Sequence, residues 1–99
     1  MPGYVSLIEI RLHQNGSQSL KEKRKLVRSL KDQVRRRFGA SVAEIDGQDT
    51  WQRTTLLCAL VGGSDVESRA DELARFVESR CPEGCGFDRD LLSLEDVRG

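Results

Sequence analysis

The sequence predicts an α+β domain whose elements follow one another in the order β-α-β-β-α-β. The hydrophobic pattern has a period of two in some segments and a helical period in others, and clusters of turn-forming residues separate these segments. With right-handed crossovers, this order gives a four-stranded antiparallel sheet with both helices on one face, which is the ferredoxin-like plait. The chain of 99 residues has the length of one domain, so we expect residues 1–99 to form a single ferredoxin-like domain.

The first two elements have the clearest signals. Tyr4 to His13 alternates between apolar and polar residues, which predicts a strand. A helix is then predicted from Ser19 to Phe38, because Ser19 and Glu22 have the spacing of a capping box and Gly39 provides the C-terminal stop. Its apolar residues share an arc of about 120° that is wide enough to cover a sheet.

The second half repeats the pattern with weaker signals. Ser41 to Asp46 alternates and predicts an edge of the sheet, whereas Thr54 to Val61 is β-branched and apolar and predicts a buried strand. Ser64 or Asp65 starts a second helix, and Phe87 to Leu94 is the last predicted strand. The residues of the second helix expected to face inward are Ala70, Leu73, Ala74 and Val77.

The face of the sheet without helices is expected to be open or covered by a partner. Alternation places several charged side chains on that face, which predicts a charged rather than an apolar surface. These side chains are Glu9, Arg11, His13, Glu44 and Asp46.

A dense basic stripe is the main functional signal. The segment from Lys21 to Arg37 contains nine basic and two acidic residues, although the whole chain has no formal net charge. Four of these basic residues follow the spacing i, i+4, i+7, i+11 and form one line along the helix: Arg24, Arg28, Lys31 and Arg35, with Lys21, Lys25 and Arg36 beside it. Such a line matches a phosphate backbone, and the alternative is a solvated face that keeps the protein soluble.

Lys23 and the start of this helix leave alternatives open. Lys23 falls within the apolar arc, so its ammonium group is expected to snorkel out near the sheet edge. Residues 15–19 lead into a helix N-terminus whose free amides can hold a phosphate, and the alternative is an ordinary capped turn.

Trp51 and Arg53 lie in the predicted connection between the second and third strands. Trp51 could stack on a base or anchor a partner, and Arg53 could bind phosphate beside it. Alternatively, Trp51 covers the end of the core, and Arg53 joins Asp46 and Asp49 in an internal polar network.

The remaining chemistry-bearing residues predict no catalytic residue, metal site or cofactor. Cys58 lies in an apolar run and is interpreted as a buried hydrophobic residue, whereas Cys81 and Cys85 are interpreted as structural or incidental thiols. His13 has no nucleophile placed beside it by the pattern, and Glu44 with Asp46 would give a metal only two ligands.

Three segments resemble the YlxP-like family of small bacterial proteins. They are Ser19 to Arg24, Ser41 to Asp46, and Asp49 to Arg53 leading into the third strand. The resemblance implies a ferredoxin-like fold. The family has no established function or catalytic residues, and its genes often lie near those for translation factors and ribosome assembly. This implies a connection to RNA or the ribosome.

We therefore expect a non-catalytic RNA- or ribosome-associated binding protein that contacts the phosphate backbone through a basic helix face. The residues predicted to bind RNA are Lys21, Lys23, Arg24, Lys25, Arg28, Lys31, Arg35, Trp51 and Arg53. One alternative is a protein-interaction module or homo-oligomer. Another is an acylphosphatase-like hydrolase, which would need an arginine in the first loop and an asparagine on the third strand, and neither is present.

The predicted location is the cytoplasm. The chain starts without the charged and apolar regions of a signal peptide. No apolar run approaches the roughly 20 residues that span a bilayer, so no membrane contact is expected.

Overall fold

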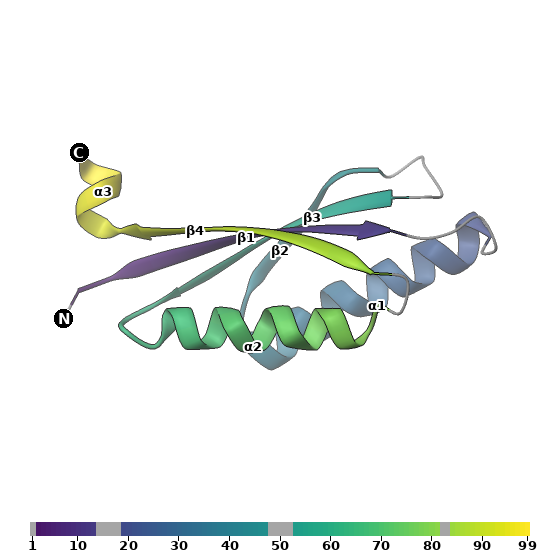
Figure 1. Cartoon of the computed structure of the whole chain (residues 1–99), viewed down its shortest axis with the longest axis horizontal. Helices are drawn as coiled ribbons and strands as arrows, with labels where there is room; N and C mark the ends of the chain where they lie inside the picture. The colour runs from purple at the N-terminus through teal and green to yellow at the C-terminus, as the bar shows by residue number, and fades with distance from the viewer. Residues whose placement is uncertain (1, 14–18, 48–52, 82–83) are drawn as a thin grey trace.

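A computed structural model describes residues 2–13, 19–47, 53–81 and 84–99, and it has the predicted ferredoxin-like plait. Four antiparallel strands form one sheet in the order β2-β3-β1-β4, and α1 and α2 lie on the same side of it (Figure 1). The elements are β1 (Tyr4–His13), α1 (Leu20–Phe38), β2 (Ser41–Asp46), β3 (Arg53–Gly62), α2 (Val66–Ser79), β4 (Cys85–Ser93) and α3 (Leu94–Arg98).

The bounds of the predicted elements agree closely with the structure, except at the C-terminal end. β4 begins two residues earlier than predicted, at Cys85. The short helix α3 was not predicted. It begins with a capping box in which Ser93 and Asp96 bond to each other's backbone amides, a signal that the weak strand pattern before it obscured.

Both ends of α1 are fixed by the residues that predicted them. The Ser19 hydroxyl accepts a hydrogen bond from the Glu22 amide at 3.2 Å. Gly39 ends the helix in the left-handed region at φ 65°, and its amide donates to the Arg35 carbonyl at 3.0 Å. A side chain at this φ is disfavoured, so glycine gives α1 a defined end.

The core lies between the sheet and the two helices. Alternate residues of the central strands face the helices, and they meet one apolar stripe from each helix. Each buried aliphatic side chain contributes roughly 1.5–3 kcal/mol through the surface it removes from water. The fully buried residues from these four elements include Ile8, Ile10, Leu56, Cys58, Leu60, Val27, Leu30, Val34, Ala70, Leu73 and Val77.

Cys58 belongs to this core, as predicted. Burial raises the pKa of its thiol to about 12, so the thiol stays protonated at neutral pH. Its role is that of a small apolar side chain.

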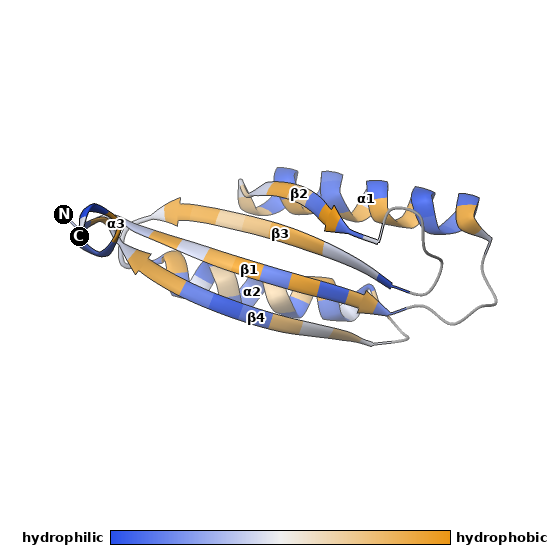
Figure 2. Ribbon diagram, turned by 90° about the horizontal axis from the view of Figure 1, so that it is seen from above, coloured by the Kyte–Doolittle hydropathy of each residue, from blue (hydrophilic) through white to orange (hydrophobic). Residues whose placement is uncertain are grey.

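The open face of the sheet is less charged than predicted. Glu44 does not lie on it, because its side chain turns toward α1 and is only 7% exposed. Apolar residues instead lie between the charges, and Val61 and Ile45 are 70% and 51% exposed. Figure 2 views the sheet from this side and shows apolar and polar segments alternating along β1 and β3. The pattern prediction failed here because it counted the charged residues and not the apolar ones between them.

The two helices cover different parts of the sheet. α2 lies behind β1 and β4, whereas α1 lies along β2 at the sheet edge (Figure 2). Arg69 of α2 joins these parts, since its guanidinium donates to the carbonyls of Phe38 at 2.9 Å and Val61 at 3.1 Å. One side of α1 is consequently left exposed. Among the described residues, no helix has the length and apolar character needed to cross a membrane.

Candidate nucleic-acid interface

The side of α1 that points away from the sheet carries three exposed cations. Lys21, Lys25 and Arg28 lie on this side, which we call the outward face. Within the described ranges, none of the three forms an ion pair. Figure 2 shows the corresponding hydrophilic side of α1 alternating with its apolar side. The outward face therefore presents positive charge that the protein itself does not neutralise.

Arg24 belongs to a different surface from these three residues. Its guanidinium makes two parallel hydrogen bonds to the Glu44 carboxylate of β2, at 2.9 Å and 2.6 Å. The pair is partly shielded, since the side chains are 31% and 7% exposed. A bidentate pair of this kind is both directional and stronger than a neutral hydrogen bond. Arg24 thus fixes the start of α1 to β2.

Arg35 and Lys31 also lie on the flank of α1 that faces β2. The Arg35 guanidinium donates to the Val42 carbonyl at 2.9 Å and lies 3.5 Å from Asp32. Lys31 is half-buried, and its charge helps to lower the pKa of Glu44. The line predicted from helical spacing is therefore divided, because Arg28 points outward while Arg24, Lys31 and Arg35 flank the sheet edge.

The Arg24–Glu44 pair predicts a stability that depends on pH. The pKa of Glu44 is lowered from its ordinary value of 4.5, chiefly because Arg24 donates hydrogen bonds to its carboxylate. A lowered pKa stabilises the folded protein above the unfolded-state pKa, and this contribution is lost as the pH falls through the folded-state pKa. We expect Glu44→Gln to reduce the free energy of unfolding by about 1–2 kcal/mol at pH 7.

Urea denaturation at several pH values checks this expectation. The difference between the wild type and Glu44→Gln should shrink below about pH 4, where the wild-type carboxylate becomes protonated. Glu78→Gln is the matched control because Glu78 is exposed and forms no ion pair within the described part of the chain. An equal loss in both variants, or a difference independent of pH, would contradict the role of the pair.

Lys23 is buried, and the prediction that its head snorkels into solvent was wrong. The whole residue is 1% exposed. Its ammonium donates to the Gly47 carbonyl at 2.7 Å and to the Arg53 carbonyl at 3.1 Å. These two residues flank the connection between β2 and β3. Carbonyl acceptors stabilise the charge inside the protein, so Lys23 holds α1 to this connection rather than facing a ligand.

The three segments that carry the family resemblance meet at one corner of the molecule. Lys23 and Arg24 from the first segment contact Gly47, Arg53 and Glu44 at or beside the other two. The shared pattern therefore encodes, at least in part, the attachment of α1 to β2 and β3.

The other predicted contacts do not join the outward face. Arg53 is exposed at the start of β3 and pairs in register with His13, which is also exposed. Both residues belong to the open face of the sheet by alternation. Trp51 and Asp49 lie outside the described residues. The proposed grouping of Trp51 with Arg53 therefore stays a prediction.

The described part of the chain contains no group of three or more histidine, cysteine, aspartate or glutamate residues suited to a metal ion. Cys81 and Cys85 are free and half-buried, and burial is the main reason why the pKa of each thiol is raised. A raised pKa disfavours the thiolate that nucleophilic chemistry needs.

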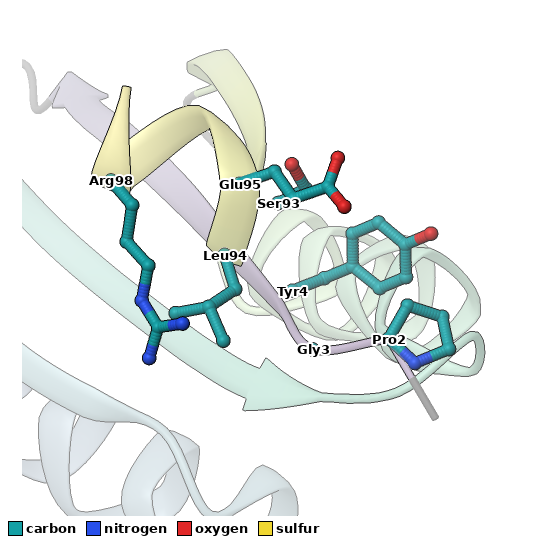
Figure 3. A pocket seen from close by; sticks show the side chains of 7 residues that line it. All are labelled: Pro2, Gly3, Tyr4, Ser93, Leu94, Glu95 and Arg98. Carbon is teal, nitrogen blue, oxygen red and sulfur yellow. The ribbon is translucent and has the colours of Figure 1, made fainter.

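A hollow of roughly 440 Å³ lies beside the two chain ends (Figure 3). Tyr4, Glu95 and Arg98 line it together with Ser93 and three further residues. The Ser93 hydroxyl accepts a hydrogen bond from the Asp96 amide at 3.0 Å, so it serves as the cap of α3. The hollow thus follows from the way in which α3 closes the end of the sheet.

A second basic group was not predicted because it combines two helices. The guanidinium carbons of Arg37 and Arg80 lie 4.5 Å and 4.9 Å from the centre of the Phe76 ring. Arg37 and Arg75 also line a hollow of roughly 440 Å³ between α1 and α2. The only sequence signal was the run of three arginines at the end of α1, which does not indicate what they contact.

Comparisons with known proteins give one family and one fold. The profile of the family described as "Protein of unknown function (DUF503)" matches residues 5–84, a range that contains all three resembling segments. The "Uncharacterized protein YlxP" of Bacillus subtilis (strain 168) is 38% identical over 63 residues, which cover 62% of this chain and 68% of the relative.

Two solved structures show the extent of the structural likeness. The de novo designed protein Foldit4 is 12% identical, with a TM-score of 0.54 and coverage of 91% of this chain and 96% of that chain. The 30S ribosomal protein S6 from Thermotoga maritima is 11% identical, with a TM-score of 0.42 and coverage of 98% and 91%. The likeness to Foldit4 supports the plait and extends to architecture alone.

Proposed function

Because the chain belongs to the DUF503 family of proteins of unknown function, as its three motif segments predicted, we propose its function from the geometry of the site. The proposal is a non-catalytic RNA- or ribosome-associated binding protein. It contacts the phosphate backbone through the outward face of α1. The cations that carry the contact are Lys21, Lys25 and Arg28.

The observation that carries this proposal is the absence of internal neutralisation on the outward face, within the residues described. Arg24 and Arg35 are engaged by β2, yet the exposed cations beside them have no such partners. Like charges spaced i, i+4 along a helix cost a few tenths of a kcal/mol each. A polyanion that lies along α1 would remove this repulsion and release its own counterions.

The open face of the sheet supports contact with the backbone rather than with stacked bases. RNA-binding plaits of the RRM type stack bases on aromatic side chains of the central strands. Here the open-face positions of β1 and β3 include Val5, Leu7, Leu57 and Val61, which offer no aromatic platform. Recognition would then depend on the shape and charge of the RNA.

Charge reversal on the outward face tests the proposal. We expect Lys25→Glu with Arg28→Glu to weaken binding to an RNA hairpin at least about tenfold, and to lower the slope of log affinity against log salt by about two. Fluorescence anisotropy at several salt concentrations measures both quantities. Neither side chain makes a described contact with the sheet, so the fold should be retained.

Arg98→Glu is the control because Arg98 is exposed on α3, on the opposite side of the sheet from α1 (Figure 1). It changes the charge without touching the outward face. Wild-type binding that is absent or independent of salt would refute the proposed function. An equal loss in Arg98→Glu would show only a response to net charge.

A protein-interaction or oligomeric module is the second candidate. The open face of the sheet favours it, because Val61 and Ile45 are 70% and 51% exposed and lie among further apolar residues. Such a face commonly marks a protein contact. Sedimentation at high concentration distinguishes this candidate, since a persistent monomer would contradict self-association through that face.

A further inference from the structure

The Phe76 ring carries the guanidinium groups of both helices. Arg37 comes from α1 and Arg80 follows α2, and their guanidinium carbons lie 4.5 Å and 4.9 Å from the ring centre. Phe38 packs against the same ring at 5.7 Å between centroids. A guanidinium held against an aromatic ring has fewer conformations to lose when it binds a ligand. Its edge N–H groups remain available to an anion.

Arg75 adds a third cation to this group. It lines the hollow between α1 and α2 together with Arg37, Phe76 and Glu72. All three arginines are exposed, and within the described ranges none is in an ion pair. Glu72 offsets one of the charges, so the group keeps an excess of positive charge. We call Arg37, Arg75 and Arg80 the groove arginines.

Their spacing fits a chain of phosphates. Arg37 and Arg80 are each within 5 Å of one ring centre, so their charges are at most about 10 Å apart. A nucleic acid strand carries one phosphate per roughly 3.4 Å of helix axis, so one strand can reach both. Bases have little access to the Phe76 faces, because the guanidiniums already lie against them. Contact with phosphates is therefore favoured over stacking.

The groove arginines also continue the outward face. Arg37 follows Arg28 by nine residues, which is about 13 Å along the axis of α1, and it follows Lys21 by about 24 Å. One band of exposed cations thus extends from the beginning of α1 to the junction with α2. A rigid band of this length suits a partner whose phosphates are also fixed in space.

We propose that the groove arginines form a second phosphate contact, and that the RNA partner contains a double-helical part that spans both contacts. This inference rests on the proposed function. The outward face contacts one stretch of backbone, and the groove arginines contact another. Single-stranded RNA does not hold two stretches of backbone at a fixed separation, so it binds less tightly at equal charge.

The test compares an RNA hairpin of about 16 base pairs with a single strand that has the same number of phosphates. Arg75→Gln with Arg80→Gln should lower the salt slope for the hairpin by about two and weaken its binding about tenfold or more. The loss for the single strand should be smaller. Arg98→Gln should leave both affinities unchanged.

A footprint on the wild-type protein provides a second measurement that needs no variant. Phenylglyoxal modifies exposed arginines, and mass spectrometry locates the products. The hairpin should protect Arg37, Arg75 and Arg80 while Arg98 still reacts.

The outcomes separate the two proposals. If the wild type fails to bind either RNA, the proposed function itself is refuted. If Lys25→Glu with Arg28→Glu abolishes binding but the groove arginines are neither protected nor needed, only the second contact is refuted. Equal affinity for the hairpin and the single strand overturns the double-helical partner.

Discussion

Replacing Lys23 with methionine should reduce the free energy of unfolding by about 2–4 kcal/mol. Methionine has nearly the length and volume of lysine but has no donor for the carbonyls of Gly47 and Arg53, which accept from the Lys23 ammonium. An apolar replacement is neutral only when both partners of a buried polar contact are replaced. Here the carbonyls remain. The start of α1 would also lose its tie to the connection between β2 and β3.

Lys25→Met is the matched control because Lys25 is exposed on the same helix. It should change the free energy of unfolding by less than about 0.5 kcal/mol. Chemical denaturation measures both variants, and hydrogen exchange at the beginning of α1 tests the local effect. If the two variants lose the same stability, Lys23 does not hold the corner together.

Gly47→Ala should destabilise the protein by about 3 kcal/mol or more. Gly47 has φ +88°, and an added Cβ would lie 2.3 Å from the Arg53 carbonyl oxygen and 2.8 Å from the Thr54 Cα. The left-handed conformation alone costs a non-glycine residue roughly 1–2 kcal/mol. The contact adds to this because backbone atoms have to move. The displaced Arg53 carbonyl is also an acceptor for Lys23, so the variant disturbs that tie as well.

Gly84→Ala separates the two causes. Gly84 has φ +97°, yet nothing lies within 4 Å of an added Cβ. Its substitution should therefore show only the conformational cost of about 1–2 kcal/mol. Thermal and urea denaturation give the comparison. Equal losses in the two variants would mean that the close approach at Gly47 has no energetic effect.

The arrangement of secondary structure was predictable because its signals are local. Alternation over Tyr4 to His13, and the pair of Ser19 and Gly39 at the ends of α1, depend on neighbouring residues alone. The fold order then follows from general rules of chain connection. The helix α3 was missed because five residues give too short a pattern, although Ser93 and Asp96 carry a clear capping signal.

The candidate site was predicted only in part, because spacing along a helix does not reveal what each side chain meets. Lys21, Lys25 and Arg28 are exposed as expected. Arg24 finds its carboxylate 20 positions away, and Lys23 finds its two carbonyls 24 and 30 positions away. Such partners are set by the packing of α1 on β2. The same limit hid the groove arginines, which meet only when α1 and α2 pack together.

The bond from Arg35 to the Val42 carbonyl has a consequence for solubility. β2 is an edge strand, and edge strands with unoccupied carbonyls and amides can recruit strands of other molecules into amyloid-like assemblies. The guanidinium occupies one of these acceptors at 2.9 Å, and an irregular register between Glu44 and Asp46 shortens the regular part of the edge. A charged residue of α1 thus also guards β2 against aggregation. Substituting Arg35 to study ligand binding would expose that edge, whereas substituting Arg28 would not.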